Sequence, residues 1–289
     1  MQLFQSYSFQ IIALGTVILA AVSGMIGCLN VYKGQSLIGD AVGHSSFPGV
    51  VLIFMLFQIR NPGLLLMGAI FTGALSYFLI QTANANSKIS LDACLAIFLS
   101  GFFGLGMVLK SIIQGNPSFT KASQSGLENY IFGQASYMLE SDVKWIAIVS
   151  GICLAMLILF YKELKLFIFD HDYASFIGIS TKTLNFILLF MTISLISVGS
   201  KAVGAILISS FLILPCVAAN QWSHHFNKVL ILSAIFGSIS AFIGTAISTL
   251  ERGFSTGPSI ILVSGGIALI SMLFGPYGAI MQYIRRRKI

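Results

Sequence analysis

Long runs of apolar residues constrain this chain more than any other feature. A helix needs about 20 apolar residues to cross a bilayer. Candidate runs lie at 9–31, 38–59, 62–81, 91–113, 143–161, 183–200, 203–220, 226–249 and 258–278. They predict an all-α, polytopic integral membrane protein with nine transmembrane helices, or eight if one of the short neighbouring runs is re-entrant. With only 9% charged residues, the chain falls far below the roughly 25% of soluble proteins. Residues 1–289 are expected to form a single transmembrane domain.

The basic residues predict orientation in the membrane and exclude nucleic acid as a partner. Apart from the tail Arg285 to Lys288, they lie singly in loops, and the tail, next to the last apolar run, indicates a cytoplasmic anchor. An N-terminus outside and a C-terminus inside would obey the positive-inside tendency. The cytoplasmic segments would then carry Lys33, Lys88, Lys162, Lys165, Lys182, Lys228 and the basic tail. The first run has no signal-peptide cleavage pattern and is expected to be retained.

Two ionisable residues, Asp40 and His44, lie in an otherwise apolar segment. Four residues apart on a helix, their side chains share one face and can chelate a divalent cation. Burying a charge at the centre of a bilayer costs about 2.5 to 3.5 kcal/mol, so such a residue is a functional candidate. The alternative is structural: Asp40 caps the helix and His44 bonds a backbone carbonyl.

Two prolines predict helix kinks. Pro48 follows His44 by four residues and cannot donate a hydrogen bond to its carbonyl, which would be free as a further ligand. Pro215 would free the carbonyl of Phe211 and kink the seventh run.

A short cytoplasmic helix is predicted within residues 169–179. Asp170 suits the N-cap and Gly178 suits the position just after the helix. His171 and Asp172 follow the cap, while Tyr173, Phe176 and Ile177 form an apolar edge. Such an edge fits docking into another protein, or else lies on lipid.

The longest polar interruption, about 114–142, is expected outside with an amphipathic helix near 126–133. That helix would contact an external partner, cap a pathway or rest at the lipid headgroups. The four cysteines all lie within apolar runs. We interpret them as small buried hydrophobic residues.

Several motifs in order along the chain resemble the permease subunits of bacterial ATP-binding cassette (ABC) importers for manganese, zinc and iron. They are Gly39-Asp40-Ala41-x-x-His44-x-x-x-Pro48-Gly49, the 169–179 loop, Val203 to Leu207 followed by Leu214-Pro215, and Thr256-Gly257-Pro258. The resemblance implies an architecture similar to the vitamin B12 (type II) importers, in the bacterial cytoplasmic membrane. It also implies a homodimer, a pair of cytoplasmic ATPases docked on the loop helix, and an external metal-binding lipoprotein.

No G-x-x-x-x-G-K-[ST] loop occurs in the chain, so ATP would act only through the partner subunit and the chain itself would not be an enzyme. One rival is an intramembrane hydrolase using Asp40, His44 or Ser45, but H-E-x-x-H and G-x-S-x-G are both absent. Another is an importer of a siderophore or cobalamin, which would need a wide cavity.

Manganese is the expected cargo, with iron as a further candidate and zinc as the alternative. Members of the zinc branch tend to carry a histidine near the position of Ser100, which this chain lacks. Two copies of Asp40 and His44 at a dyad would suit Mn²⁺, Fe²⁺ or Zn²⁺ better than Cu⁺. Without an extra imidazole, the site has room for the water or carbonyl oxygens that six-coordinate Mn²⁺ would use.

Overall fold

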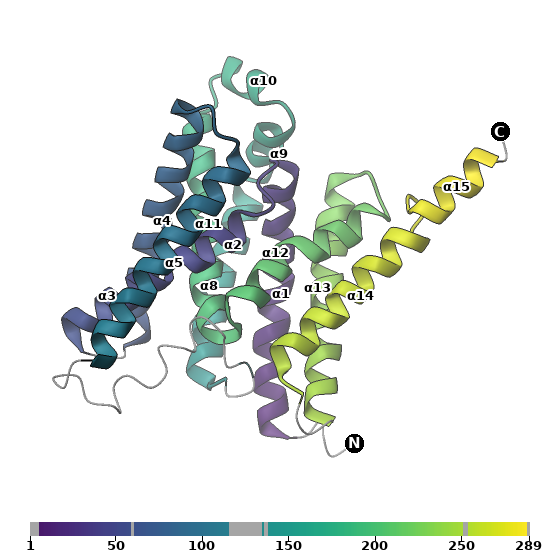
Figure 1. Cartoon of the computed structure of the whole chain (residues 1–289). Helices are drawn as coiled ribbons and strands as arrows, with labels where there is room; N and C mark the ends of the chain where they lie inside the picture. Colours follow the sequence, from purple (N-terminus) through teal and green to yellow (C-terminus); the bar gives the residue numbers. More distant parts are fainter. Residues whose placement is uncertain (1–5, 59–60, 116–134, 136–137, 251–253, 288–289) are drawn as a thin grey trace. The chain divides into compact units, whose positions relative to one another are not determined.

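The computed structural model describes residues 6–58, 61–115, 135, 138–250 and 254–287, and their regular elements are helices (Figure 1). These are α1 (Tyr7–Tyr32), α2 (Ile38–Ser45), α3 (Phe47–Phe57), α4 (Pro62–Asn86), α5 (Leu91–Gly115), α8 (Glu140–Leu159), α9 (Tyr161–Phe169), α10 (His171–Phe176), α11 (Thr181–Val203), α12 (Ala205–Asn220), α13 (Phe226–Leu250), α14 (Thr256–Phe274) and α15 (Ala279–Arg287). The predicted all-α fold is confirmed.

Eight segments of the described chain are long and apolar enough to cross a membrane, as in the smaller of the two predicted numbers. The remaining predicted run, 203–220, forms α12, whose 16 residues span only about 24 Å at 1.5 Å per residue. Gly204 separates α12 from α11 with a φ of +91°, a left-handed conformation that glycine adopts without a steric penalty. Pro215 lies inside α12; the kink that it would cause stays a prediction.

The chain divides into two compact units, each built from apolar helices. Unit 1 contains residues 1–36, 134–195 and 210–289, and unit 2 contains residues 37–133 and 196–209. Whether they act as one domain stays a prediction.

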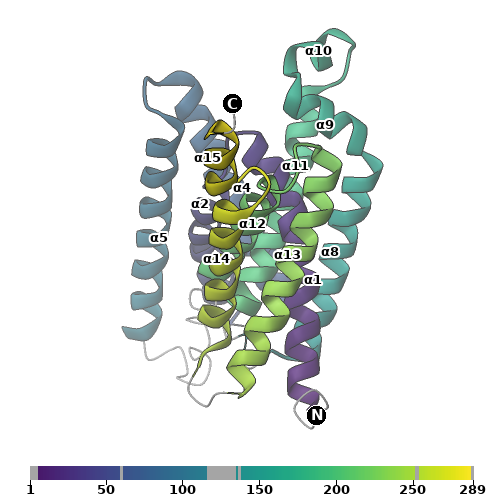
Figure 2. The ribbon, with the colours of Figure 1, turned by 90° about the vertical axis from the view of Figure 1, so that its right-hand side faces the viewer.

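In unit 1, α1 lies side by side with α13 and α8 (Figure 2). Small residues bring other backbones close to α1: a Cβ on Gly27 would lie 2.0 Å from the carbonyl oxygen of Leu212. Only glycine permits that approach. A buried hydrogen bond from Asn30 to Thr192 also joins α1 to α11.

The two ends of unit 1 gather different segments. Tyr32, at the end of α1, donates a 2.6 Å hydrogen bond to Asn220 and packs against Phe226. Trp222 in turn donates to Ser271, near the end of α14. The last turns of α1, α12 and α14 therefore lie at one end of the unit, together with the start of α13. Tyr7, the first residue of α1, lies at the opposite end beside Glu140.

In unit 2, α3 packs closely on α4 and α5. A Cβ on Gly49 would lie 2.0 Å from the Gly68 carbonyl oxygen, so the α3 and α4 backbones are nearly in contact. The core around this crossing consists of Phe47, Val50, Val51, Phe54, Leu65, Ala69 and Ile113. It supports the short helix α2 that precedes α3.

Candidate metal site and exposed short helix

The pattern of α2 separates a buried face from a partly open one. Ile38, Ala41, Val42 and Ser45 follow helical spacing and are buried. Asp40 and His44 lie on the other side, with 44% and 20% of their side chains exposed. Packing of the apolar face therefore leaves both candidate ligands accessible from one direction.

The structure brings the two candidate ligands together. The Nε2 atom of His44 lies 3.5 Å from Oδ1 of Asp40. Two ligand atoms bound about 2.1 Å from one first-row ion, at 90° to 110°, lie about 3.0 to 3.4 Å apart. A divalent cation thus needs little movement of either side chain to be chelated by this pair.

Phe103 of α5 lies against His44, with ring centroids 5.2 Å apart and planes at 83°. This edge-on contact restricts the imidazole on the side next to α5. Sequence reasoning missed Phe103, because a phenylalanine in an apolar run carries no signal of its neighbour. Ser45 is fully buried and accepts a 2.9 Å hydrogen bond from Ser76, a poor arrangement for the nucleophile of the rival hydrolase.

Pro48 lies in the first turn of a new helix. Ser46 separates α2 from α3, and its N–H still donates to the Val42 carbonyl at 2.9 Å as the C-cap of α2. α3 then begins at Phe47, with the proline in a position where no intrahelical N–H is required. The role of the His44 carbonyl as a further ligand stays a prediction.

One copy of the chain supplies few of the usual metal ligands at this site. Among the described residues, no group of three or more His, Cys, Asp or Glu side chains could hold a metal ion. The Asp40–His44 pair therefore requires ligands from elsewhere: carbonyl oxygens, water or a second copy.

The short helix α10 has the predicted caps. The Asp170 side chain accepts a 3.0 Å hydrogen bond from the Tyr173 N–H, and Gly178 has a φ of +85°. Between them, Phe176 is 87% exposed and Tyr173 is 52% exposed. His171 and Asp172 occupy the first turn. α10 thus presents an apolar edge that the rest of the described chain leaves uncovered.

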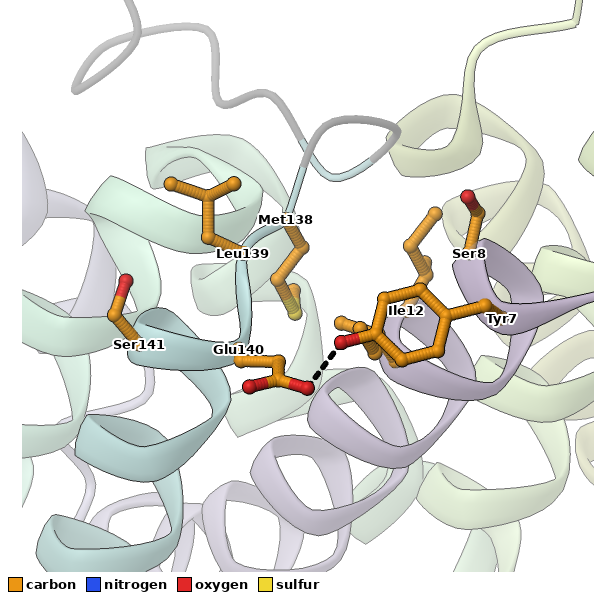
Figure 3. A pocket seen from close by; sticks show the side chains of 8 residues that line it. Tyr7, Ser8, Ile12, Met138, Leu139, Glu140 and Ser141 are labelled. Carbon is orange, nitrogen blue, oxygen red and sulfur yellow. Dashed lines mark hydrogen bonds between the residues drawn. The ribbon is translucent and has the colours of Figure 1, made fainter.

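A hollow of about 540 Å³ lies at the other end of unit 1, where α1 and α8 begin. Figure 3 shows the hydroxyl of Tyr7 directed at the carboxylate of Glu140 across this hollow. The amphipathic helix expected near 126–133, and with it most of the 114–142 segment, lies outside the described residues.

Comparisons with known proteins place this geometry in context. The family model described as the ABC 3 transport family matches residues 5–275. The zinc transport system membrane protein TroC of Treponema pallidum (strain Nichols) is 37% identical over all of this chain and 96% of its own length. The manganese transport system membrane protein MntC of Bacillus subtilis (strain 168) is 37% identical over 91% of this chain and 60% of its own length.

A solved structure agrees with the fold. The PsaBC complex of Streptococcus pneumoniae with Fab contains a chain that superposes with a TM-score of 0.84 and is 27% identical. The alignment covers 98% of the present chain and 97% of that chain.

Proposed function

The chain belongs to the ABC 3 transport family, and on that premise we propose that it is the membrane-spanning permease subunit of an ABC importer for a divalent metal ion. The relatives named above transport zinc or manganese, and each spans nearly all of this chain. The translocation pathway would be formed by the permease, and ATP would be hydrolysed by a separate subunit.

The pair of Asp40 and His44, 3.5 Å apart on the open face of α2, is the observation that carries this proposal. A carboxylate and an imidazole together suit Mn²⁺, Fe²⁺ or Zn²⁺. Within the described part of the chain, no third His, Cys, Asp or Glu side chain joins the pair to form a metal-binding group. In a homodimer, two such pairs facing each other across a dyad would give two oxygen and two nitrogen ligands.

We favour manganese as the cargo, with iron next, and keep zinc as the alternative. Ser100 lies on α5 one turn before Phe103, the residue that contacts His44. A histidine at position 100 would add an imidazole near the pair, whereas serine leaves room for water. Six-coordinate Mn²⁺ uses such oxygen ligands. The names of the relatives do not choose between the metals, because one is a zinc protein and the other a manganese protein.

Uptake of radioactive manganese by cells that depend on this importer tests the proposal. Asp40→Ala and His44→Ala each remove one ligand and should lower uptake at least about tenfold, since the loss of 1.4 kcal/mol at the transported ion is a tenfold effect. Asp92→Ala and His225→Ala remove exposed side chains of the same kinds elsewhere and should leave uptake unchanged. Normal uptake by the Asp40/His44 double variant would refute the assigned site.

The metal itself is tested by growth in metal-depleted medium. Manganese should restore growth through the wild-type importer. Rescue by zinc without rescue by manganese would overturn the preference for manganese and leave the importer proposal intact.

Three protein partners complete the proposal. A pair of cytoplasmic ATPases would bind the apolar edge of α10, and a second copy of the chain would complete the metal site. An external metal-binding lipoprotein would deliver the ion at the end of unit 1 where α1 and α8 begin, next to Tyr7 and Glu140. In this arrangement α10 faces the cytoplasm and the N-terminus faces outward.

A further inference from the structure

Tyr32, the last residue of α1, and Lys33, its C-cap, contact the segment that leads into α10. The ammonium of Lys33 lies over the ring of Phe167, 5.3 Å from its centroid. Phe167 in turn packs against His171, the first residue of α10, with ring centroids 5.4 Å apart. Tyr32 packs on Phe169 at 5.3 Å. Tyr32 and Lys33 thus contact Phe169 and Phe167, two residues in the last turn of α9 before α10.

Lys33 is bound on its other side by α11. Its ammonium donates a hydrogen bond to the side-chain oxygen of Asn185. Two turns further along α11, Thr192 accepts a 2.9 Å hydrogen bond from Asn30, so the two polar pairs lie on one face of α11. Because the Asn30 pair is buried, breaking it would leave unpaired polar groups in an apolar setting. The end of α1 is therefore fixed to α11 as well as to α9.

Burial lowers the pKa of Lys33 to about 8, so the side chain still carries its charge at neutral pH. Among the described residues no carboxylate forms an ion pair with this ammonium, and burying an unpaired charge is unfavourable for folding. A methionine of similar length would fill the same space without that cost. A lysine directly after an apolar run is common at a membrane boundary, but there its ammonium extends into water, whereas the ammonium of Lys33 lies between Phe167 and Asn185.

The sequence adds a reason why this anchoring matters. Gly34, with a φ of +76°, ends α1, and the N–H of Gln35 closes the helix by donating to the Asn30 carbonyl. Only residues 34–37 then separate Lys33 from α2, which carries Asp40 and His44. Residues 34–37 are therefore a short covalent connection between the end of α1 and the start of α2.

We infer that Lys33 is a positioning residue for energy coupling, which holds the end of α1 to α9 and α11 so that movement of α10 reaches α2. This inference rests on the proposed function, because it takes α10 as the contact with the ATPase. Lys33 touches neither the metal nor ATP. Its loss should therefore separate ATP hydrolysis from transport while leaving both binding events in place.

The complex of permease and ATPase in proteoliposomes tests this role by the number of metal ions transported per ATP hydrolysed. Lys33→Met should lower that ratio at least about fivefold, the low end of typical coupling between sites. Binding of the ATPase and of manganese should stay at wild-type strength. Lys33→Arg keeps a cation over Phe167 and should retain most of the ratio. Lys162→Met, at an exposed lysine of α9, is the matched control and should behave as wild type.

Substitutions of the residues that contact Lys33 distinguish loss of this contact from a folding defect in Lys33→Met. Asn185→Leu and Phe167→Leu remove the two partners of Lys33 and keep apolar volume, and each should lower the ratio. Combining Asn185→Leu with Lys33→Met should add little to either single effect. A wild-type ratio in Lys33→Met, or an equal loss in Lys162→Met, would overturn the inference. Failure of the wild-type complex to transport metal would instead refute the proposed function.

Discussion

The buried ammonium of Lys33 makes the stability of unit 1 depend on pH. Its pKa is lowered to about 8 by burial, from an ordinary value of 10.5. Between these two values the unfolded chain binds a proton that the folded chain has released, so stability rises with pH across this window. Below about pH 8 both states are protonated, and the folded protein bears the full cost of the buried charge.

We predict that the thermal midpoint in detergent increases from pH 8 to pH 10 more steeply in the wild type than in Lys33→Met. The side chain contributes up to about 3 kcal/mol over the whole window. The methionine variant should be the more stable protein at pH 7, and the difference should shrink as the pH rises. Parallel pH profiles for the two proteins would contradict the assignment of a buried charge at Lys33.

Among single residues, the sequence allowed functional candidates to be predicted where the side-chain chemistry is unusual for its surroundings. Asp40 and His44 are ionisable residues in an apolar run, and their four-residue spacing placed them on one face as the structure does. Lys33 gave no such signal, since a lysine directly after an apolar run is expected at any membrane boundary. Its partner Asn185 lies 152 residues further along the chain. Only tertiary packing brings the two together.

Among the helices, α10 shows best what local sequence determines. Its caps are side-chain and backbone interactions within a few residues of each other, so Asp170 and Gly178 were sufficient to predict its position. The short length of α12 was less predictable. Its composition is as apolar as that of a spanning helix. However, the break at Gly204 leaves only 16 residues before α12 ends at Asn220, fewer than a full span requires. The interruption at Ser46 was likewise predicted only as a kink at Pro48.

The exposed apolar edge of α10 leads to a prediction about ATPase binding. Phe176→Asp would place a charge in the proposed contact with the ATPase, where an unpaired charge costs about 3 to 5 kcal/mol when fully buried. We expect the permease to fold and insert normally, because Phe176 is 87% exposed, and to lose most of its bound ATPase on co-purification. Asn86→Asp adds the same charge at the exposed end of α4 and should leave binding intact. Unchanged ATPase binding in Phe176→Asp would show that α10 lies on lipid instead.

At the scale of the whole molecule, the contacts within unit 1 show which helix ends lie together. The start of α1 lies beside the start of α8, whereas the ends of α1 and α14 lie at the other end with α9. α11 begins at that same end, through Asn185, and α12 returns the chain to it at Asn220. α11 therefore begins, and the 16-residue α12 ends, at the same end of unit 1. The predicted placement of the two termini on opposite sides of the membrane stays a prediction.

Which end faces the cytoplasm can be measured by labelling single cysteines in intact cells. The four native cysteines are all buried, so a membrane-impermeant maleimide should report mainly on introduced sites. Ser8→Cys, in the first turn of α1, and Ser175→Cys, on α10, are both at exposed positions but at opposite ends of unit 1. In cells without the ATPase subunit, we expect Ser8→Cys to be labelled at once and Ser175→Cys only after the membrane is permeabilised. The basic tail at residues 285–288 favours this orientation through the positive-inside tendency. Labelling of Ser175→Cys in intact cells would show that α10 faces outward, which would contradict the predicted orientation and the proposed contact of α10 with a cytoplasmic ATPase.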